Sequence, residues 1–589
     1  MDGGLRNEVY RPIITKINYK KYKRCIMLKF AEFPYVRPDI DAIVAKLGGL
    51  TADLKAADTA EKAIEAIKGY RDVLIDYMSM RSIATTRYNI NTRDPYYLEE
   101  NKFFNKFGPV VDKAMVEFGS AILACAFIPE IKAEFGDIFI TNIQFKAKSM
   151  TADVIELMQE ENALNAKYQE FNATAQIPFN GKILTVPDIN VLMASDDRET
   201  RKAAYQALSD FYVKNGEFYD SVYDALVKNR TEQAKRMGLK NYTELGYIRR
   251  NRNCFTPADV DVFRKQIAED IVPAIMKAKQ MHLERIGQPE GKIKIYDNDF
   301  YFADGNPKTF ESADDMMAAA VEVFRELSPE TRDYINLMEE GKYYDAPSRE
   351  GKKVGAYCTG IPTHKAPFVF LNYAGSAADV TTTFHEFGHG FNVFFGRENP
   401  NTVLNNSTLD IAEIHSMTME FMTEGGLHKF FKSEEDVAKQ KLSHLEHCLT
   451  FLAYGTMVDH FQHIVYDNPE LTPAQRNEEW RKLENIYRPF MDFDNIEYYE
   501  TGRTWQRQQH LFSAPFYYID YVLAQTIAFQ FWAIGTEDFA KSFQMYVDLT
   551  KKGGRYTFVD LVRQTGLRVP FEEGSLKFIA EKVMAELNK

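Results

Sequence analysis

Residues 383–389 read Thr-Phe-His-Glu-Phe-Gly-His and contain the pattern H-E-x-x-H, with His385, Glu386 and His389 at its fixed positions. On a helix, His385 and His389 lie one turn apart and project from the same face. Two neutral imidazoles at this spacing can share one Zn²⁺, and the glutamate beside the first can reach a water molecule on that ion. The stretch therefore predicts a zinc-binding helix.

The residues around the motif support that helix. Ser376 or Asp379 can cap its start. Apolar residues then recur at helical spacing, namely Val380, Phe384, Phe387, Phe391 and Phe394. A helix with two structural histidines would show the same pattern, so a third ligand and a group that stabilises an oxyanion are needed to decide between the two.

A second helix is predicted at residues 409–424, opened by Ser407 or Asp410 and stopped by Gly425-Gly426. Glu413 lies 28 residues after His385, which leaves enough chain for a helix, a loop and a return. A carboxylate completing a His₂Glu site leaves the fourth coordination position open, as hydrolysis requires. Glu420 lies two turns further on the same face and can accept a hydrogen bond from a ligand histidine. His415 faces away and is expected to be structural.

A third stretch, residues 510–521, combines His510 with the aromatic cluster Tyr517, Tyr518 and Tyr521. Amide cleavage places negative charge on the former carbonyl oxygen, and a histidine or a tyrosine hydroxyl can donate a hydrogen bond to it. Tyr518 and Tyr521 share a helix face at i and i+3. An aromatic stripe of this kind is also typical of a hydrophobic core, so the pattern by itself leaves both interpretations open.

Residues 368–372 form a short run of β-forming residues before the zinc helix. Such a strand could present its edge to an extended peptide through main-chain hydrogen bonds. The alternative is a core strand in a small sheet, and the two are compatible, since one edge can pair while the other remains open.

Composition sets wider limits. The chain has 589 residues with 45% apolar and 26% charged residues, which predicts a globular protein of two or more subdomains. A net charge of −12 argues against a nucleic-acid surface. Five scattered cysteines without a C-x-x-C pair favour a reducing cytosol over a disulfide framework. Residues 513–534 look apolar enough for a membrane span, but Asp520, Gln525 and Gln530 interrupt them, so a buried helix and no membrane partner are expected.

Along the chain the pattern is mainly helical. Asn180-Gly181 within residues 175–186 predicts a two-residue hairpin. Residues 1–26 carry a basic run and are expected to be a disordered or vector-derived extension, with Met27 as the natural start; an arm attracted to nucleic acid or membranes is the alternative. We expect a helical N-terminal domain at residues 27–195 and a catalytic domain at residues 196–589.

The three blocks together closely resemble the zinc oligopeptidases of the thimet oligopeptidase and oligoendopeptidase F group, on the oligoendopeptidase F side. The matching segments are 385–389, 410–413 with Glu420, and His510 with residues 517–521, and the resemblance extends from about Met27 to the C-terminus. It implies a mainly helical, clam- or bowl-shaped molecule with a zincin-like core and a deep channel that admits only short, flexible peptides.

The resemblance also implies roles for single residues. One Zn²⁺ per chain would be bound by His385, His389 and Glu413, with Glu386 as the base. His510, Tyr518 and Tyr521 would contact the substrate or the oxyanion. The segments that hold Gly355, Tyr357, Phe370 and Asn372 resemble the family's substrate-lining region, and Tyr517 is expected to contact substrate as well. Which tyrosine stabilises the oxyanion stays open.

The predicted reaction is hydrolysis of an internal peptide bond, in which Glu386 removes a proton from the water on zinc and passes it to the leaving amine. Two alternatives remain. A zinc carboxypeptidase on a similar helical scaffold would share the motif, and an inactive peptide-binding protein would keep the channel without the chemistry. The oligomeric state, monomer or homo-oligomer, is not predicted.

Overall fold

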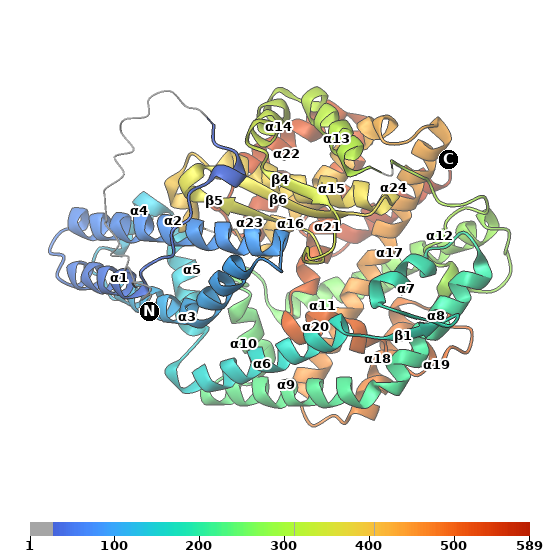
Figure 1. Ribbon diagram of the computed structural model, residues 1–589, viewed down its shortest axis with the longest axis horizontal. Helices are drawn as coiled ribbons and strands as arrows, with labels where there is room; N and C mark the ends of the chain where they lie inside the picture. The colour runs from blue at the N-terminus through green and yellow to red at the C-terminus, as the bar shows by residue number, and fades with distance from the viewer. Residues whose placement is uncertain (1–26, 311, 406) are drawn as a thin grey trace, which may run out of the picture.

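The computed structural model describes residues 27–310, 312–405 and 407–589, and most of them are helical (Figure 1). The N-terminal extension expected at residues 1–26 lies outside the described residues. The helices form two groups, a small N-terminal group with its own apolar core and a larger group that shares its core with a three-stranded sheet.

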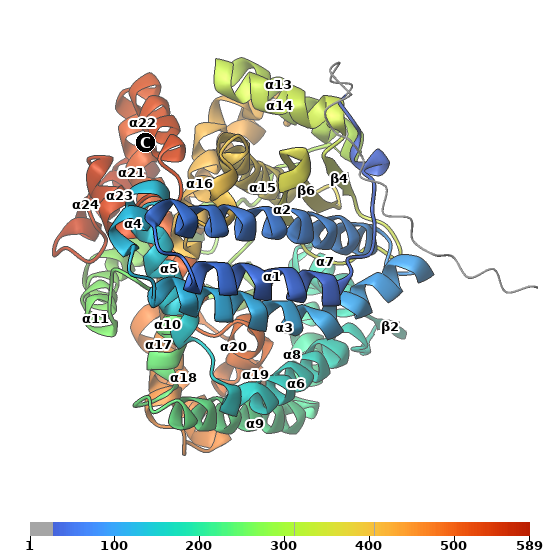
Figure 2. The ribbon, with the colours of Figure 1, turned by 90° about the vertical axis from the view of Figure 1, so that its left-hand side faces the viewer.

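The N-terminal group is a layer of long helices with its own apolar core. Helices α1, α2 and α3 lie side by side, as Figures 1 and 2 both show in blue. Their buried side chains, among them Ile67, Tyr70 and Phe118, form a cluster separate from the main core. The helices of this group are α1 (Ile40–Lys55), α2 (Ala60–Ile90), α3 (Pro95–Leu123), α4 (Ile128–Phe135) and α5 (Asp137–Lys148).

A hairpin and two helices connect this group to the rest of the chain. Asn180 and Gly181 both have positive φ, 48° and 77°, which two-residue hairpin turns of this kind require. The hairpin predicted from Asn-Gly is therefore confirmed, with β1 pairing antiparallel to β2. The connecting elements are α6 (Ile155–Ala173), β1 (Ile177–Phe179), β2 (Lys182–Leu184) and α7 (Val186–Met193).

The remaining helices share one continuous core. The apolar run noted in the sequence becomes the buried helix α21, which confirms the prediction. In the described part of the chain no single helix is long and apolar enough to cross a membrane. Helices α3 and α4 taken together have the length and apolar composition of a membrane span, but the chain bends sharply, by 118°, between them. These helices are α8 (Arg198–Lys214), α9 (Gly216–Arg236), α10 (Tyr242–Arg249), α11 (Pro257–Gln266), α12 (Val272–Arg285), α13 (Ala313–Leu327), α14 (Pro329–Gly341), α15 (Ala377–Gly396), α16 (Leu409–Met422), α17 (Glu434–Asp467), α18 (Pro473–Tyr487), α19 (Glu497–Glu500), α20 (Gln509–Ser513), α21 (Tyr518–Glu537), α22 (Phe539–Lys551), α23 (Phe558–Gln564) and α24 (Ser575–Leu587).

The three-stranded sheet has the order β4-β6-β5. Strand β6 (Ala366–Tyr373) pairs parallel with β4 (Tyr344–Pro347) and antiparallel with β5 (Tyr357–Ile361). Both edges of β6 are therefore occupied, so residues 368–372 form a core strand, which was the alternative interpretation of the sequence, and the open edge does not belong to them. Strand β5 lies at one edge of the sheet, and no other strand among the described residues pairs with its outer side. The sequence of residues 368–372 could not reveal this, because a run of β-forming residues does not show how many strands will pair with it. A further pair, β3 (Ile293–Lys294) with β7 (Met491–Asp492), lies elsewhere.

Two helices packed against each other carry the predicted metal ligands. Ser376 caps α15 and Asp379 returns the bond to the backbone of Ser376, so both candidate capping residues take part. Helix α16 begins after Thr408 and ends at Met422, so both predicted caps of that helix are wrong. A 3₁₀ segment, η8 (Glu424–Lys429), follows it and contains the two glycines that were expected to end the helix.

Candidate active site

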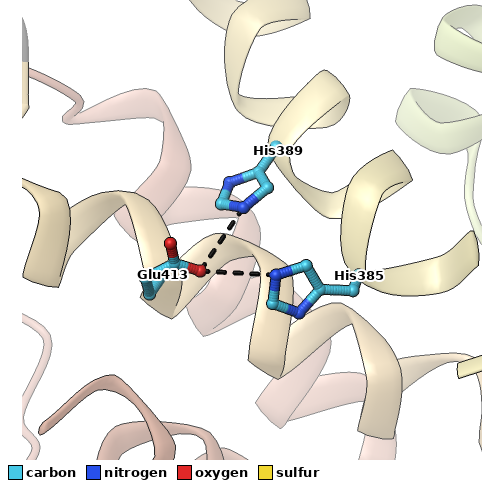
Figure 3. A group of neighbouring side chains, drawn as sticks. All are labelled: His385, His389 and Glu413. Atoms are coloured by element: carbon cyan, nitrogen blue, oxygen red, sulfur yellow. Dashed lines mark ion pairs between the residues drawn. The ribbon is translucent and has the colours of Figure 1, made fainter. Parts of the chain in front are cut away.

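The three predicted metal ligands converge on one point. Glu413 Oε2 lies 3.4 Å from Nε2 of His385 and 3.4 Å from Nε2 of His389. Figure 3 shows the two imidazoles reaching from α15 toward the carboxylate on α16. The histidine side chains are 19% and 20% exposed, while Glu413 is 4% exposed. The group is thus open to solvent from the histidine side.

Close packing of the two helices makes this convergence possible. A Cβ placed on Gly388 would lie 2.6 Å from the carbonyl oxygen of His415 and 2.8 Å from Cα of Ser416, both in the backbone of α16. Only glycine lets the backbones come so near. Gly388 therefore sets the distance between the histidines and Glu413.

The second glutamate of α16 holds one ligand from behind. Glu420 Oε1 lies 2.7 Å from Nδ1 of His385, and Glu420 Oε2 lies 2.8 Å from Nε2 of His444 on α17. A carboxylate on Nδ1 leaves Nε2 of His385 free as the ligand atom. Glu420 thus lies where the sequence placed it, and His444 is a partner that sequence reasoning missed.

The carboxylate of Glu413 is held by two hydroxyl groups. Tyr517 donates to Oε1 at 2.8 Å, and Ser416 donates to Oε2 at 2.9 Å. Tyr517 was expected to contact the substrate, whereas here its hydroxyl binds a ligand residue. Oε2 remains the oxygen that faces both imidazoles.

Glu386 lies next to His385 in the chain, and one of its carboxylate oxygens has no hydrogen-bond partner among the described residues. This oxygen is Oε2, and the residue is buried. Burial raises the pKa of its carboxyl group above the usual range, although the nearby His385 and His389 oppose the shift. A raised pKa suits a group that accepts a proton and then returns it.

The tautomer of His510 follows from its neighbours. Tyr454 donates to Oε1 of Gln508 at 2.9 Å, so the amide nitrogen of Gln508 faces Nδ1 of His510 at 3.0 Å. An amide nitrogen only donates, so Nδ1 accepts and Nε2 carries the hydrogen. Burial, together with the nearby Arg250, lowers the pKa of His510 to about 4. At neutral pH the residue is therefore a neutral donor.

The three tyrosines have different neighbours. Tyr517 and Tyr521 stack with ring centroids 4.8 Å apart, and the carboxylate of Glu413 influences the pKa of both. Tyr518 packs against Phe451 and Tyr454 of α17, and its ring also lies 4.9 Å from that of His510. Burial keeps the pKa of the Tyr521 hydroxyl above its usual value, so that it remains a donor.

The predicted substrate-lining residues form a support for the β5 edge. The amide of Asn372 donates to the carbonyl oxygens of Lys353 and Gly355 at 2.8 and 2.6 Å. The hydroxyl of Tyr357 accepts from Asn89 on α2 at 2.9 Å. Phe370 is completely buried beneath the ring of Tyr357 at 4.9 Å. Phe370 was expected to contact the substrate, but its side chain is enclosed here, because β6 is the central strand of the sheet.

His415 lies on the opposite face of α16, as expected. Its side chain is fully buried, with Nδ1 3.2 Å from the hydroxyl of Thr550. Ser416, His444 and Gln508 are the supporting residues that the sequence did not reveal. Ser416 stands three residues after Glu413, a spacing that could have indicated it, whereas no short-range signal marks the other two.

The donor set fits a tetrahedral zinc ion. Zinc bonds of about 2.0–2.1 Å place tetrahedral ligand atoms roughly 3.4 Å apart, which is the separation between Glu413 Oε2 and each imidazole nitrogen. Two histidines and one carboxylate also leave a position open, as catalytic rather than structural zinc sites do.

Comparison with known proteins agrees with this geometry. The sequence profile described as peptidase family M3 matches residues 191–581, and that of the peptidase M3 N-terminal domain matches residues 30–150. The chain belongs to peptidase family M3. The predicted zinc-oligopeptidase resemblance is thereby confirmed.

Individual relatives of this M3 peptidase cover most of its length. The oligopeptidase PepF of Bacillus subtilis is 23% identical over 90% of this chain and 81% of its own. A chromosomal oligoendopeptidase F of Lactococcus lactis is 26% identical over 71% of this chain and 69% of its own. A solved structure of PZ peptidase A with an inhibitor superimposes with a TM-score of 0.89 at 37% identity, covering 95% and 99% of the two chains.

These findings settle the enzyme class and the fold class. The chain is a metalloendopeptidase of the oligopeptidase type, and its mainly helical, clam-shaped fold is the predicted one. The family implies a metal cofactor and peptide substrates. The domain boundary at residue 195 and the roles of single site residues stay predictions.

Proposed function

We propose that this M3 peptidase is a zinc-dependent oligoendopeptidase that cuts internal bonds of short, unfolded peptides, with Glu386 as general base. The observation that carries the proposal is the meeting of Nε2 of His385 and His389 at 3.4 Å from one oxygen of Glu413. That donor set, with a buried glutamate next to it in sequence, supports metal-assisted hydrolysis.

His385, His389 and Glu413 would hold the ion. A bound Zn²⁺ lowers the pKa of a water molecule and polarises the scissile carbonyl group. Glu420 orients His385 by accepting from Nδ1, and Tyr517 holds Glu413 through the oxygen that does not face the imidazoles. These contacts keep the ligand atoms in place before substrate arrives.

Glu386 would take a proton from the attacking water and deliver it to the nitrogen of the leaving amine. Its free Oε2 and its raised pKa support both steps. Nε2 of His510 carries a hydrogen, and Tyr521 stacks on Tyr517 and is close enough to Glu413 for that carboxylate to help raise its pKa. We assign these two neutral donors to the oxyanion, and Tyr518, which packs on α17, to a wall of the substrate site.

The free edge of β5 would bind the peptide as an added strand, since main-chain hydrogen bonds serve any sequence. Gly355, Tyr357 and Asn372 fix the start of that edge. The scattered cysteines, of which four are free in the described residues, favour a cytosolic location.

The test is cleavage of an internally quenched, end-blocked peptide of about eight residues, with chelator and then with added zinc. The length is our estimate for an enclosed site. We expect internal fragments by mass spectrometry, loss of activity with chelator and recovery with zinc. Cleavage that removes only C-terminal residues from unblocked peptides would favour the carboxypeptidase alternative, and peptide binding without any cleavage would favour the inactive binding protein.

A further inference from the structure

Arg507 is a solvent-accessible arginine that precedes His510 by three residues in the chain. Arg507 is the last residue of the 3₁₀ segment η9 (Thr504–Arg507) and directly precedes Gln508. Gln508 contacts both Tyr454 and His510. The His510 ring in turn lies 5.8 Å from the ring of Tyr517, which binds Glu413. A continuous path of contacts therefore joins Arg507 to the metal ligands.

Arg507 faces an enclosed space. Its side chain is exposed to solvent, yet burial is the largest single influence on its pKa and lowers it. An arginine on the outer surface would be exposed without such desolvation. The combination places the guanidinium in a water-accessible interior. His447, which lies two turns before Tyr454 on α17, shows the same combination of exposure and a pKa lowered by burial.

Four tyrosine side chains dominate the electrostatic surroundings of Arg507. After burial, the largest influences on its pKa come from Tyr499, Tyr212, Tyr454 and Tyr498, which together keep it above the usual value. These side chains come from the three helices α19, α8 and α17. Burial raises the pKa of each hydroxyl, that of Tyr499 to about 12, so all four are neutral at physiological pH.

The positive charge of Arg507 is therefore not balanced by the protein. Nearby arginines are paired: Arg488 lies 3.7 Å from Glu484, and Arg481 lies 3.2 Å from Glu500. Within the described ranges Arg507 makes no ion pair. The buried hydroxyl of Tyr498 also lacks a hydrogen-bond partner there. A cation in an enclosed, water-accessible space without a counter-charge attracts an anion more strongly than one on the open surface, because fewer water molecules screen it.

We propose that Arg507 binds a carboxylate of the bound peptide and thereby selects which bond meets the metal ligands. The inference rests on the proposed peptidase function. A guanidinium forms two parallel hydrogen bonds with a carboxylate, and peptides bring one either at the C-terminus or on an Asp or Glu side chain. A C-terminal carboxylate would favour short peptides, because only in these does the chain end lie near the cleaved bond.

The experiment measures kcat/KM for two matched pairs of quenched peptides whose fluorophore and quencher sit on side chains. The first pair differs only in a C-terminal carboxylate or amide, and the second, amidated pair differs only in one Asp or Asn. The proteins are wild type, Arg507→Gln, Arg507→Lys and the control Arg563→Gln. Arg563 is 59% exposed and paired with Glu572 on the surface, so its substitution removes the same charge away from the site.

We expect wild type to prefer the carboxylate member of one pair by about 10- to 100-fold, the range for a charge-assisted hydrogen bond. Arg507→Gln should reduce that preference to near one, Arg507→Lys should keep part of it, and Arg563→Gln should keep all of it. Preference in the first pair identifies the C-terminus as the source, and preference in the second identifies an acidic side chain. Equal preference in wild type and Arg507→Gln overturns the proposal.

Two further measurements keep this result separate from the peptidase function. If wild type cleaves the amidated peptides in a chelator-sensitive way, the proposed function stands whatever Arg507 does. If wild type cleaves none of them, calorimetric binding of the same peptides decides: a carboxylate preference that depends on Arg507 supports the inference, and its absence refutes it. Thermal unfolding checks each variant, and Arg507→Lys carries the comparison if the glutamine variant does not fold.

Discussion

Substitution of Gly388 by alanine tests whether the spacing of α15 and α16 controls the metal site. The new Cβ would lie 2.6 Å from the carbonyl oxygen of His415, whereas ordinary contact begins at 3.4 Å. The obstruction is backbone and cannot rotate away, so the helices must separate by about 0.8 Å, the difference between these two distances. Glu413, two residues before His415, would move with α16.

The expected loss of zinc affinity follows from how little the ligand distances in a metal site can change. Ligand distances in zinc sites vary by about 0.2 Å, so a shift of about 0.8 Å in Glu413 is several times too large. We expect zinc affinity to fall by about 100-fold or more. Overpacking costs about 1–3 kcal/mol, and replacing glycine within a helix returns about 1 kcal/mol. The free energy of unfolding should therefore drop by about 0–2 kcal/mol.

The assay is competition for zinc with a chromophoric chelator, together with thermal unfolding of the metal-free protein. Gly48→Ala is the matched control, because Gly48 lies inside α1 and a Cβ there meets nothing within 4 Å. The control should bind zinc normally and gain about 1 kcal/mol. If Gly388→Ala kept wild-type zinc affinity and gained stability like the control, the reasoning about helix spacing would be refuted.

Three further predictions concern single side chains. Glu386→Gln should retain zinc and reduce turnover of the quenched peptide by about 10²–10⁴-fold. Turnover equal to that of wild type would show that Glu386 is not the general base. Glu420→Ala should weaken zinc binding by about 10- to 100-fold, since His385 loses the acceptor at 2.7 Å; an unchanged chelator competition curve would contradict this. Burial lowers the pKa of His460 to about 4, below the unfolded value of about 6.5. The unfolded chain therefore binds the proton first as pH falls, and wild type should lose about 1.4 kcal/mol per pH unit between pH 6.5 and 4 relative to His460→Gln. Urea unfolding of both proteins at pH 7 and 5 measures it, and a constant difference would show that His460 is not held neutral.

The contacts within one helix or one turn could be predicted from the sequence. His385 and His389 share a face because one helical turn separates them, and Asn180-Gly181 makes a hairpin because both residues tolerate positive φ. Glu413 could be named as a ligand because only a few carboxylates follow the motif at a suitable distance. In each case local geometry limits the outcome to few possibilities.

Contacts between distant segments depended on the tertiary structure. The shared helix face predicted the contact between Tyr518 and Tyr521, whose ring centroids are 5.8 Å apart, but it did not predict that Tyr517, which precedes α21, also stacks on Tyr521. The burial of Phe370 required two flanking strands that the sequence run did not reveal.

The sequence by itself determined that His385 and His389 can bind one metal ion, because spacing along a helix fixes which side chains share a face. The resemblance of three separate blocks to a known family indicated the class of enzyme. Only the tertiary structure decided that His444 supports Glu420, that Gln508 sets the tautomer of His510, and that Arg507 faces an enclosed space without a counter-charge. These relations join elements far apart in the chain. They depend on how helices pack, and no local pattern of residues specifies that.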